Sequence, residues 1–244
     1  MSVATRPMAR EQARAIAAAF APARLFGSRW DYFYSRSKLA SDPLYPGVCE
    51  ALRDSTAPLL DIGCGLGLLA HALRADGIGL HYRGIDNDAG KIERARAAAR
   101  RQGLSDVGFE RIDLAAPGFS LDALGHCGSV AILDVLQFIP PDAQDRTVDA
   151  AIGMLAPGAR LVIRTGLAGH DARARITRAV DWLSRVLRWM NTGPKAYPER
   201  AALASLLADR GLRSTFTPRW GGTPFNNWLL VAEHSSGGSG TTQR

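Results

Sequence analysis

The chain has 244 residues, of which 46% are hydrophobic and 22% are charged, and its formal net charge is +7. This length suits one α/β domain with some additions better than two domains, and it allows a substantial buried core. No apolar run approaches the roughly 20 residues that a membrane-spanning helix needs. We ascribe the positive charge to an arginine-rich composition on solvated surfaces, although nucleic acid, an anionic membrane or an acidic substrate would also suit it.

The N-terminal sequence and the cysteines indicate the cellular compartment of the protein. The stretch "MAREQARAIAAAF" is basic and then alanine-rich, as in a secretory signal, but Glu11 and Arg14 interrupt it. We therefore expect an N-terminal helix there. The three cysteines, Cys49, Cys64 and Cys127, are scattered and form no CxxC pair. We expect a cytoplasmic protein with no disulfide framework and no metal site.

The first part of the chain, residues 1–46, reads as a mostly helical cap that contains the aromatic cluster "RWDYFY". That cluster holds too many aromatic rings for a solvated loop, so we expect some of them to be buried, in the core or in a lid over a ligand. We interpret residues 47–234 as the main domain, with a basic helical insertion at about 170–197. Residues 235–244 are polar and read as a disordered tail.

From residue 58 onward, strand-like runs alternate with helix-like runs. The strand-like runs are "PLLDI", "LHYRGID", "VGFERID", "SVAILDVL" and "ARLVIRTG". This alternation predicts an α/β fold with a doubly wound, parallel sheet and helices on both faces. The pattern then changes to a helix, "ERAALASLLADRG", and two further strand-like runs, "LRSTFTPRW" and "NNWLLVAEH", joined by a turn.

A long basic helix is predicted at 172–190. It carries one apolar stripe, and Trp182 and Trp189 fall beside that stripe among arginines. Tryptophan at the border of an apolar and a basic face is typical of a helix that lies on a membrane surface. A lid or core helix with a solvated arginine face, and a helix that binds a protein partner, are the alternatives.

A glycine-rich loop follows the first strand-like run. The stretch "LLDIGCGLG" places Gly63, Gly65 and Gly67 after Asp61. Such a loop lets the backbone approach a ligand while the next helix offers free N–H groups. Position 68, where the dinucleotide fingerprint has its third glycine, is a leucine.

Acidic residues recur at the ends of the next strands. Asp86 ends the second strand-like run, Asp113 the third, and Asp134 follows the core of the fourth. These strand ends share one edge of a parallel sheet, where open α/β sheets bind ligands, and an acid after the second strand is placed to accept both hydroxyls of a ribose. The alternative for each acid is a turn-capping role.

The segments "LLDIGCGLG", "GIDND", "RIDL", "AILDVLQFIP" and "LAPGARLVIRT" resemble, in order, the motifs of class I S-adenosylmethionine-dependent methyltransferases. The resemblance covers about 58–166. It implies a mostly parallel seven-stranded sheet with an antiparallel last strand, which the two final strand-like runs would complete. It also implies S-adenosyl-L-methionine as cofactor and S-adenosyl-L-homocysteine as product.

The resemblance assigns cofactor contacts residue by residue. Asp61 would meet the methionine amino group, and Asp86 the ribose hydroxyls. Gly63 and Gly65 would let the backbone approach the methionine and ribose. The other implied positions are Cys64 as a small filler, Asn87 beside the adenine, Asp113 at the adenine amino group, Leu114 against the ring, and Asp134 and Leu136 on the methionine side.

Methyl transfer is an in-line displacement, which requires alignment of acceptor, methyl and sulfur and exclusion of water. A hydroxyl acceptor benefits from a base. His170, just after the fifth strand, is the first candidate for that base, with an ordinary loop histidine as the alternative. Lower-ranked bases are Asp171, His126, His71 and Asp134, and the candidate acceptor contacts are Tyr34, Arg36, Asn226 and Asn227.

We therefore expect methyl transfer to a small hydrophobic or aromatic acceptor, with O-methylation favoured. The alternatives are an RNA or protein methyltransferase, a non-catalytic scaffold that binds the adenosyl cofactor, and, last, a nicotinamide oxidoreductase. We do not expect a nucleic-acid partner. A membrane surface or a carrier protein would bind through 172–190, which would place the protein at the membrane periphery.

Overall fold

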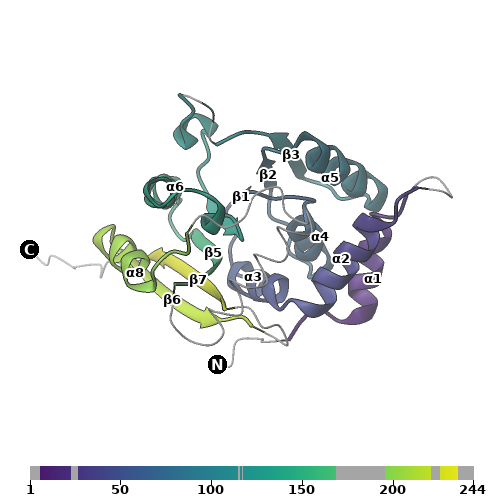
Figure 1. Cartoon of the computed structure of the whole chain (residues 1–244), viewed down its shortest axis with the longest axis horizontal. Coiled ribbons are helices and arrows are strands. Elements are labelled where there is room, and N and C mark those ends of the chain that lie inside the picture. Colours follow the sequence, from purple (N-terminus) through teal and green to yellow (C-terminus); the bar gives the residue numbers. More distant parts are fainter. Residues whose placement is uncertain are drawn as a thin grey trace, which may run out of the picture.

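The computed structural model describes residues 6–22, 27–114, 116, 118–168, 196–220 and 226–235. Within them, seven strands form one sheet in the order β3-β2-β1-β4-β5-β7-β6 (Figure 1). The strands are β1 (Leu59–Ile62), β2 (Tyr82–Asp86), β3 (Val107–Arg111), β4 (Ser129–Leu133), β5 (Arg160–Gly166), β6 (Leu212–Pro218) and β7 (Asn227–His234). Strands β1 to β5 pair in parallel, whereas β7 is antiparallel to both β5 and β6. The predicted fold class is confirmed.

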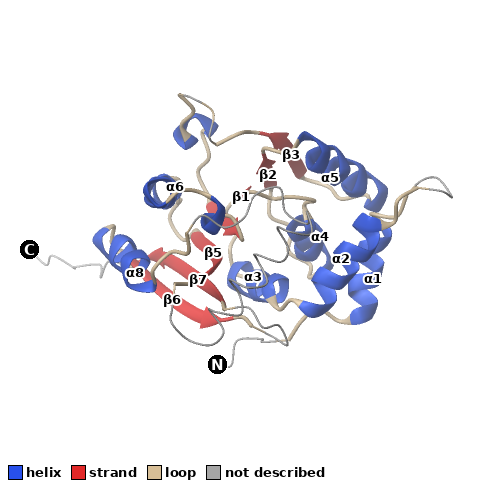
Figure 2. Ribbon diagram, in the orientation of Figure 1, coloured by secondary structure: helices blue, strands red, loops and turns tan. Residues whose placement is uncertain are grey.

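Helices cover both faces of this sheet (Figure 2). One group is α1 (Arg10–Ala18), α2 (Trp30–Ser41), α3 (Leu44–Leu52), α4 (Leu68–Ala75) and α5 (Ala89–Gln102). These five helices share one hydrophobic core with residues of the sheet. The second core lies on the other face and contains α6 (Pro141–Gly153), α8 (Arg200–Asp209) and the short 3-10 helices η1 (Leu121–Leu124) and η2 (Leu136–Phe138).

The central strands are apolar throughout because both of their faces are covered. In β4, Val130 and Ile132 enter the core beneath α6, whereas Ala131 between them enters the core beneath α4. Successive side chains of a strand point to opposite faces, so a strand buried on both faces reads as a continuous apolar run. This explains why "SVAIL" shows no alternation.

The N-terminal helices belong to the same core as the main domain. Ile16 of α1, Leu39 of α2 and Val48 of α3 are all buried in it. The proposed division after residue 46 lies inside α3, and it stays a prediction. Most of the proposed insertion and tail, including the basic helix at 172–190, lies outside the described residues.

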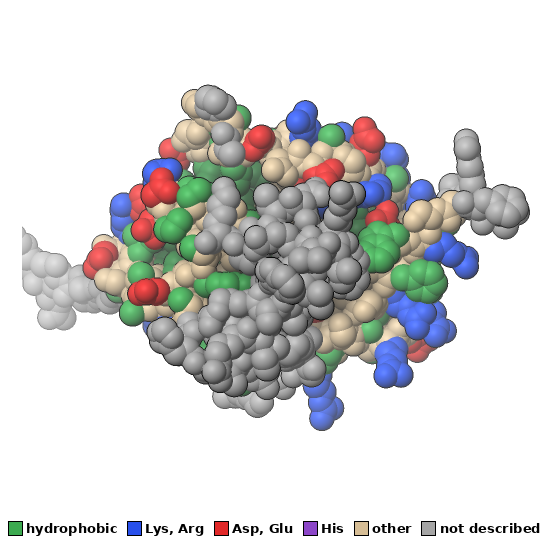
Figure 3. Space-filling model, in the orientation of Figure 1, with side chains coloured by type: hydrophobic (Ala, Val, Ile, Leu, Met, Phe, Trp, Pro, Cys, Tyr) green, Lys and Arg blue, Asp and Glu red, His purple; other side chains and the backbone are tan. Residues whose placement is uncertain are grey.

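The aromatic cluster differs from the sequence expectation. Trp30, Phe33 and Tyr34 of α2 are 53%, 52% and 43% exposed, and only Tyr32 is half-buried. The expectation that some of these rings are buried is met only by the partial burial of Tyr32, because α2 turns the small Ser35 and the aliphatic Leu39 toward the core instead. Hydrophobic and basic side chains lie together on the α1–α2 side of the molecule (Figure 3).

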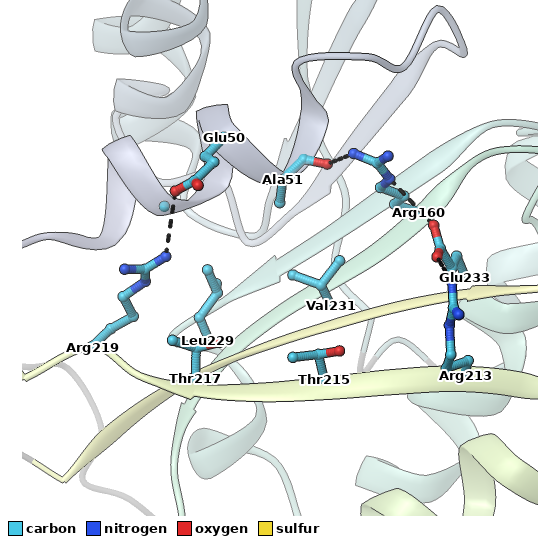
Figure 4. Close-up of a pocket in the computed structure, with 11 residues that line it drawn as sticks. Glu50, Ala51, Arg160, Arg213, Thr215, Thr217, Arg219, Leu229, Val231 and Glu233 are labelled. Atoms are coloured by element: carbon cyan, nitrogen blue, oxygen red, sulfur yellow. Dashed lines mark hydrogen bonds and ion pairs between the residues drawn. The ribbon is translucent and has the colours of Figure 1, made fainter. Parts of the chain in front are cut away.

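Arginines bind the antiparallel end of the sheet to α3. A groove of about 260 Å³ lies between α3 and strands β6 and β7 (Figure 4). At one end, Glu233 of β7 pairs with Arg213 at 2.7 Å and with Arg160 at 3.6 Å. Arg160 also donates to the carbonyl of Ala51 at the end of α3. Part of the excess positive charge therefore has a structural use.

No helix among the described residues is long and apolar enough to cross a membrane.

Glycines at the two ends of α4 provide a test of local packing. Gly67 and Gly77 both have positive φ, +72° and +77°. A Cβ on Gly67 would overlap the Phe109 ring, whereas a Cβ on Gly77 would meet nothing within 4 Å. We expect Gly77→Ala to lower the free energy of unfolding by about 1 kcal/mol through backbone strain, and Gly67→Ala by about 3 kcal/mol through strain plus overlap. Urea denaturation followed by circular dichroism measures both, and equal losses would contradict this packing.

Candidate active site

The loop after β1 adopts a conformation that glycine favours. Gly63, Gly65 and Gly67 all have positive φ, between +55° and +76°. The carbonyl of Ile85 in β2 accepts hydrogen bonds from the N–H groups of Gly63 at 2.8 Å and of Cys64 at 2.9 Å. A Cβ on Gly63 would overlap Val135, whereas a Cβ on Gly65 would meet nothing within 4 Å. Packing thus requires the first glycine, and the open side of the second leaves room for a ligand to reach the backbone.

Asp86 is held at the end of β2 by two backbone groups. Its Oδ2 accepts from the N–H of Gly65 at 3.0 Å, and its Oδ1 accepts from the N–H of Asp88 at 2.9 Å. A carboxylate has about four lone-pair sites, so both oxygens can still accept from the hydroxyls of a diol. The loop and the ribose acid of the sequence prediction therefore lie side by side.

Asp61 in β1 is buried, with only 2% of its surface exposed. The Tyr82 hydroxyl donates to its Oδ2 at 2.6 Å, whereas its Oδ1 has no hydrogen-bond partner among the described residues. Burial raises the pKa of this carboxyl to about 7, against the opposing effect of the Tyr82 hydrogen bond. A buried acceptor without a partner costs free energy. It therefore fits a donor or cation that a ligand brings.

Asp134 follows β4 and has the unusual φ of +60°. Arg164 of β5 donates to its Oδ2, and Lys38 of α2 reaches the same oxygen at 3.2 Å. Both cations also bind Asp42, Arg164 at 3.0 Å and Lys38 at 2.7 Å. We call Lys38, Asp42, Asp134 and Arg164 the ion cluster.

The ion cluster balances two cations with two carboxylates. Burial alone would raise the pKa of Asp42, but Arg164 and Lys38 lower it below its ordinary value. Burial alone would lower the pKa of Lys38, but Asp134 raises it above its ordinary value. Lys38 therefore stays protonated at neutral pH, and the Asp134 oxygen that it binds already has two cationic partners.

Some of the other predicted cofactor residues lie at the carboxyl edge of the sheet, and the rest pack in the core. Asn87 follows β2, and its carbonyl accepts from Arg111 at 3.2 Å. Asp113 is exposed after β3. Leu114 packs against the core under α6, and Leu136 is fully buried in that core. Cys64 is half-buried, and burial raises the pKa of its thiol far above the ordinary value, in keeping with a small filler.

The described histidines named as possible bases do not lie together at the carboxyl edge of the sheet. His71 is buried on α4, where its Nδ1 lies 2.8 Å from the Gln102 side chain and burial lowers its pKa. His126 precedes β4, at the opposite edge of the sheet, and its Nε2 lies 2.9 Å from the Ser129 carbonyl. His170 and Asp171 lie outside the described residues.

Two of the predicted acceptor contacts do lie at the site edge. Asn227 opposes Gly166 at the carboxyl end of β5, and Asn226 beside it is buried. The Asn226 amide donates to the Leu167 carbonyl at 3.2 Å and accepts from Trp228 at 3.0 Å. This amide therefore holds the ends of β5 and β7 together.

Tyr34 and Arg36, the other two, are exposed on α2. Lys38, Asp42 and Arg164 were missed by the sequence reasoning. The only available signals were an arginine inside the apolar run "LVIRT" and a lysine four residues before an aspartate.

Comparisons with known proteins concern the same part of the chain. Residues 59–158 match the family model described as "Methyltransferase domain". The matched family model and the similar solved structures below are those of methyltransferases, and the matched stretch includes the glycine loop, Asp86 and Asp134.

Among curated proteins, this chain resembles the ubiquinone biosynthesis O-methyltransferase of Xylella fastidiosa, with 32% identity over 164 residues. That match covers 65% of this chain and 61% of the relative, so the chain spans about three fifths of the relative's length. Human methyltransferase-like protein 27 is 36% identical over 76 residues, 31% of each chain.

Solved structures share the fold of most of this chain. An O-methyltransferase family protein from Burkholderia thailandensis has a TM-score of 0.62 at 22% identity, covering 96% of this chain and 66% of that one. Magnesium protoporphyrin IX methyltransferase from Synechocystis, solved with bound S-adenosylhomocysteine, has a TM-score of 0.57 at 18% identity, covering 92% and 94%.

The ion cluster predicts a large effect of removing its central cation. Arg164→Met leaves the buried Asp42 with Lys38 alone, so we expect a loss of about 3 kcal/mol in the free energy of unfolding near neutral pH. Arg160→Met on the same strand removes a more exposed pair, and we expect a loss of about 1 kcal/mol or less. Urea denaturation of both variants measures the difference.

The pH dependence of that loss follows from Asp42. The pKa of Asp42 is lowered in the folded protein. Asp42 therefore stabilises the fold at pH values above the ordinary carboxyl pKa of about 4, and this stabilisation is lost as the pH falls further. The difference in the free energy of unfolding between wild type and Arg164→Met should therefore become smaller below about pH 4. A gap that stays constant with pH, or equal losses for the two arginine variants, would show that the cluster does not act through charge.

Proposed function

We propose that the chain transfers the methyl group of S-adenosylmethionine to an oxygen of a small, hydrophobic or aromatic acceptor. The observation that carries this proposal is the pairing of an open Gly65 with two carboxylates, Asp86 held by that loop and Asp61 left with an unpartnered oxygen. The relatives support an oxygen acceptor. One of them is a ubiquinone biosynthesis O-methyltransferase, and a structural neighbour, with a TM-score of 0.54, is an O-methyltransferase in complex with apigenin.

In this proposal each residue of the site has a binding role. Asp86 accepts both ribose hydroxyls, and the buried Oδ1 of Asp61 accepts from the methionine ammonium. Gly63 and Gly65 give the backbone its close approach, and Asn87, Asp113 and Leu114 lie along the adenine side. The cofactor supplies a methyl group activated on a sulfonium, and the chain aligns the acceptor with it and excludes water.

The acceptor proton must leave as the methyl group is transferred. Lys38 is protonated and Asp134 already binds two cations, so neither is a ready base. His170 is therefore the base that we propose. A phenol needs less help than an aliphatic hydroxyl because its pKa, near 10, is already low. We also retain 172–190 as the proposed contact for a membrane surface or a carrier protein.

Calorimetry of ligand binding tests the cofactor assignment. We expect micromolar binding of S-adenosylhomocysteine and no binding of NADH. Asp86→Ala removes two charge-assisted hydrogen bonds to the ribose, so affinity should fall at least about 30-fold. Asp88→Ala is the matched control, because it removes the N-terminal cap of α5 but no ribose contact.

Folded wild-type protein that binds no S-adenosylhomocysteine would overturn the proposed function, as would tight binding of NADH. Where the cofactor binds, incubation with S-adenosylmethionine and a panel of phenols that includes apigenin, with mass spectrometry of the products, tests the transfer itself.

The raised pKa of Asp61 predicts how cofactor affinity depends on pH. Below about pH 7 the free protein carries Asp61 in its neutral form, which cannot pair with an ammonium. Affinity for S-adenosylhomocysteine should therefore fall by up to about tenfold for each pH unit below that value, with proton release on binding. Asp61→Asn should bind more weakly at neutral pH and show no such slope. A wild-type affinity that does not change between about pH 5 and 8 would contradict the role of Asp61.

A further inference from the structure

Gln137 stands out among the side chains near the end of β4. It lies in η2, three residues after Asp134, and it is 9% exposed. The Thr165 hydroxyl of β5 donates to its Oε1 at 3.0 Å. Its Nε2 makes no hydrogen bond to any described residue, and it is not sealed from solvent.

Two nearby amide side chains, Asn226 and Gln144, make a different set of hydrogen bonds from Gln137. Asn226 donates to Leu167 and accepts from Trp228, as described above. Gln144 of α6 donates from its Nε2 to the carbonyls of Ile139 and Ala196, at 3.2 and 3.0 Å. Of these three amides, Gln137 is the one whose nitrogen donates to no described residue.

The position of Gln137 is set by the same strands that build the ion cluster. The N–H of Asp134 donates to the carbonyl of Arg164 at 2.8 Å, which continues the pairing of β4 and β5 to their carboxyl ends. Thr165 follows Arg164, and Gly166 next to it opposes Asn227. Gln137 is thereby anchored at the end of β5, between the ion cluster and the start of β7.

We propose that Gln137 binds the methyl acceptor, with its Nε2 donating a hydrogen bond to an acceptor oxygen other than the one that is methylated. This inference rests on the proposed function. Thr165 is a positioning residue: its hydroxyl, whose one hydrogen is shared with the Gly166 carbonyl at 3.0 Å, donates to Oε1 and so leaves the donor side of the amide available. The ligand class is a small molecule that carries an ether, carbonyl or hydroxyl oxygen besides its reactive hydroxyl. Gln137 moves no proton and forms no bond to carbon.

Matched phenols test this role. Each pair consists of a methoxyphenol and the ethylphenol of the same shape, with the substituent in the 2, 3 or 4 position, so the members differ in one hydrogen-bond acceptor. Binding is measured by calorimetry on protein saturated with S-adenosylhomocysteine, and transfer is measured with S-adenosylmethionine. We expect wild type to prefer the methoxy member by about 10-fold for at least one pair.

Three variants separate the donor from its orientation. Gln137→Leu and Gln137→Glu should both abolish the preference, because leucine offers no polar group and a carboxylate only accepts. Thr165→Val should weaken the preference by freeing the amide to rotate. Affinity for S-adenosylhomocysteine should stay unchanged in all three. Gln144→Leu is the matched control: it removes a structural amide and should keep the preference.

The outcomes distinguish this inference from the proposed function. Wild type that binds S-adenosylhomocysteine but prefers no methoxyphenol, or binds neither member of any pair, would overturn the role of Gln137 alone. A preference that survives Gln137→Leu would do the same. Failure to bind S-adenosylhomocysteine would overturn both.

Discussion

The buried guanidinium of Arg164 is the constraint on which the site depends. A charge that is withdrawn from water must be paired and hydrogen-bonded. The fold meets this requirement at the two terminal nitrogens by bringing Asp42 from the N-terminal helices and Asp134 from the end of β4 to the same cation, whereas its Nε has no hydrogen-bond partner among the described residues. Lys38 completes the set from α2. The N-terminal helices are therefore joined to the sheet by ion pairs, and α2 is fixed beside the carboxyl ends of β4 and β5.

The same constraint shapes the segment after β4. Asp134 is held at a φ of +60°, which a residue with a side chain adopts only where its surroundings over-determine it. From that turn the chain places Val135 in the space that Gly63 leaves empty and seats Leu136 in the core. The glycine loop and the segment after β4 thus meet where Gly63 lies against Val135, so a shift of either backbone would displace the other.

The fold and the glycine loop could be predicted from the sequence because their signals are local. Runs buried on both faces read as apolar strands, and the left-handed turns of the loop require glycine at Gly63 and Gly67. The ion cluster was missed because its members lie far apart in the chain, as do Lys38 and Asp134, 96 residues apart. Gln137 was missed for the same reason, since Thr165 is 28 residues away. The exposure of the aromatic rings of α2 could not be predicted, because the number of aromatic residues does not say which face of the helix is buried.

Charge balance at the ion cluster bears on which acceptors suit this edge. With two cations and two carboxylates, the cluster offers an anionic acceptor no net attraction, while the anion would still lose its hydration on entering. A neutral phenol avoids that cost and can be oriented by uncharged donors such as the Gln137 amide. In the proposed reaction, the phenol proton passes to the proposed base, His170, in step with methyl transfer rather than before binding. Because its charges balance, the ion cluster favours a methyl acceptor that is recognised by its shape and hydrogen bonds over one that is recognised by its charge.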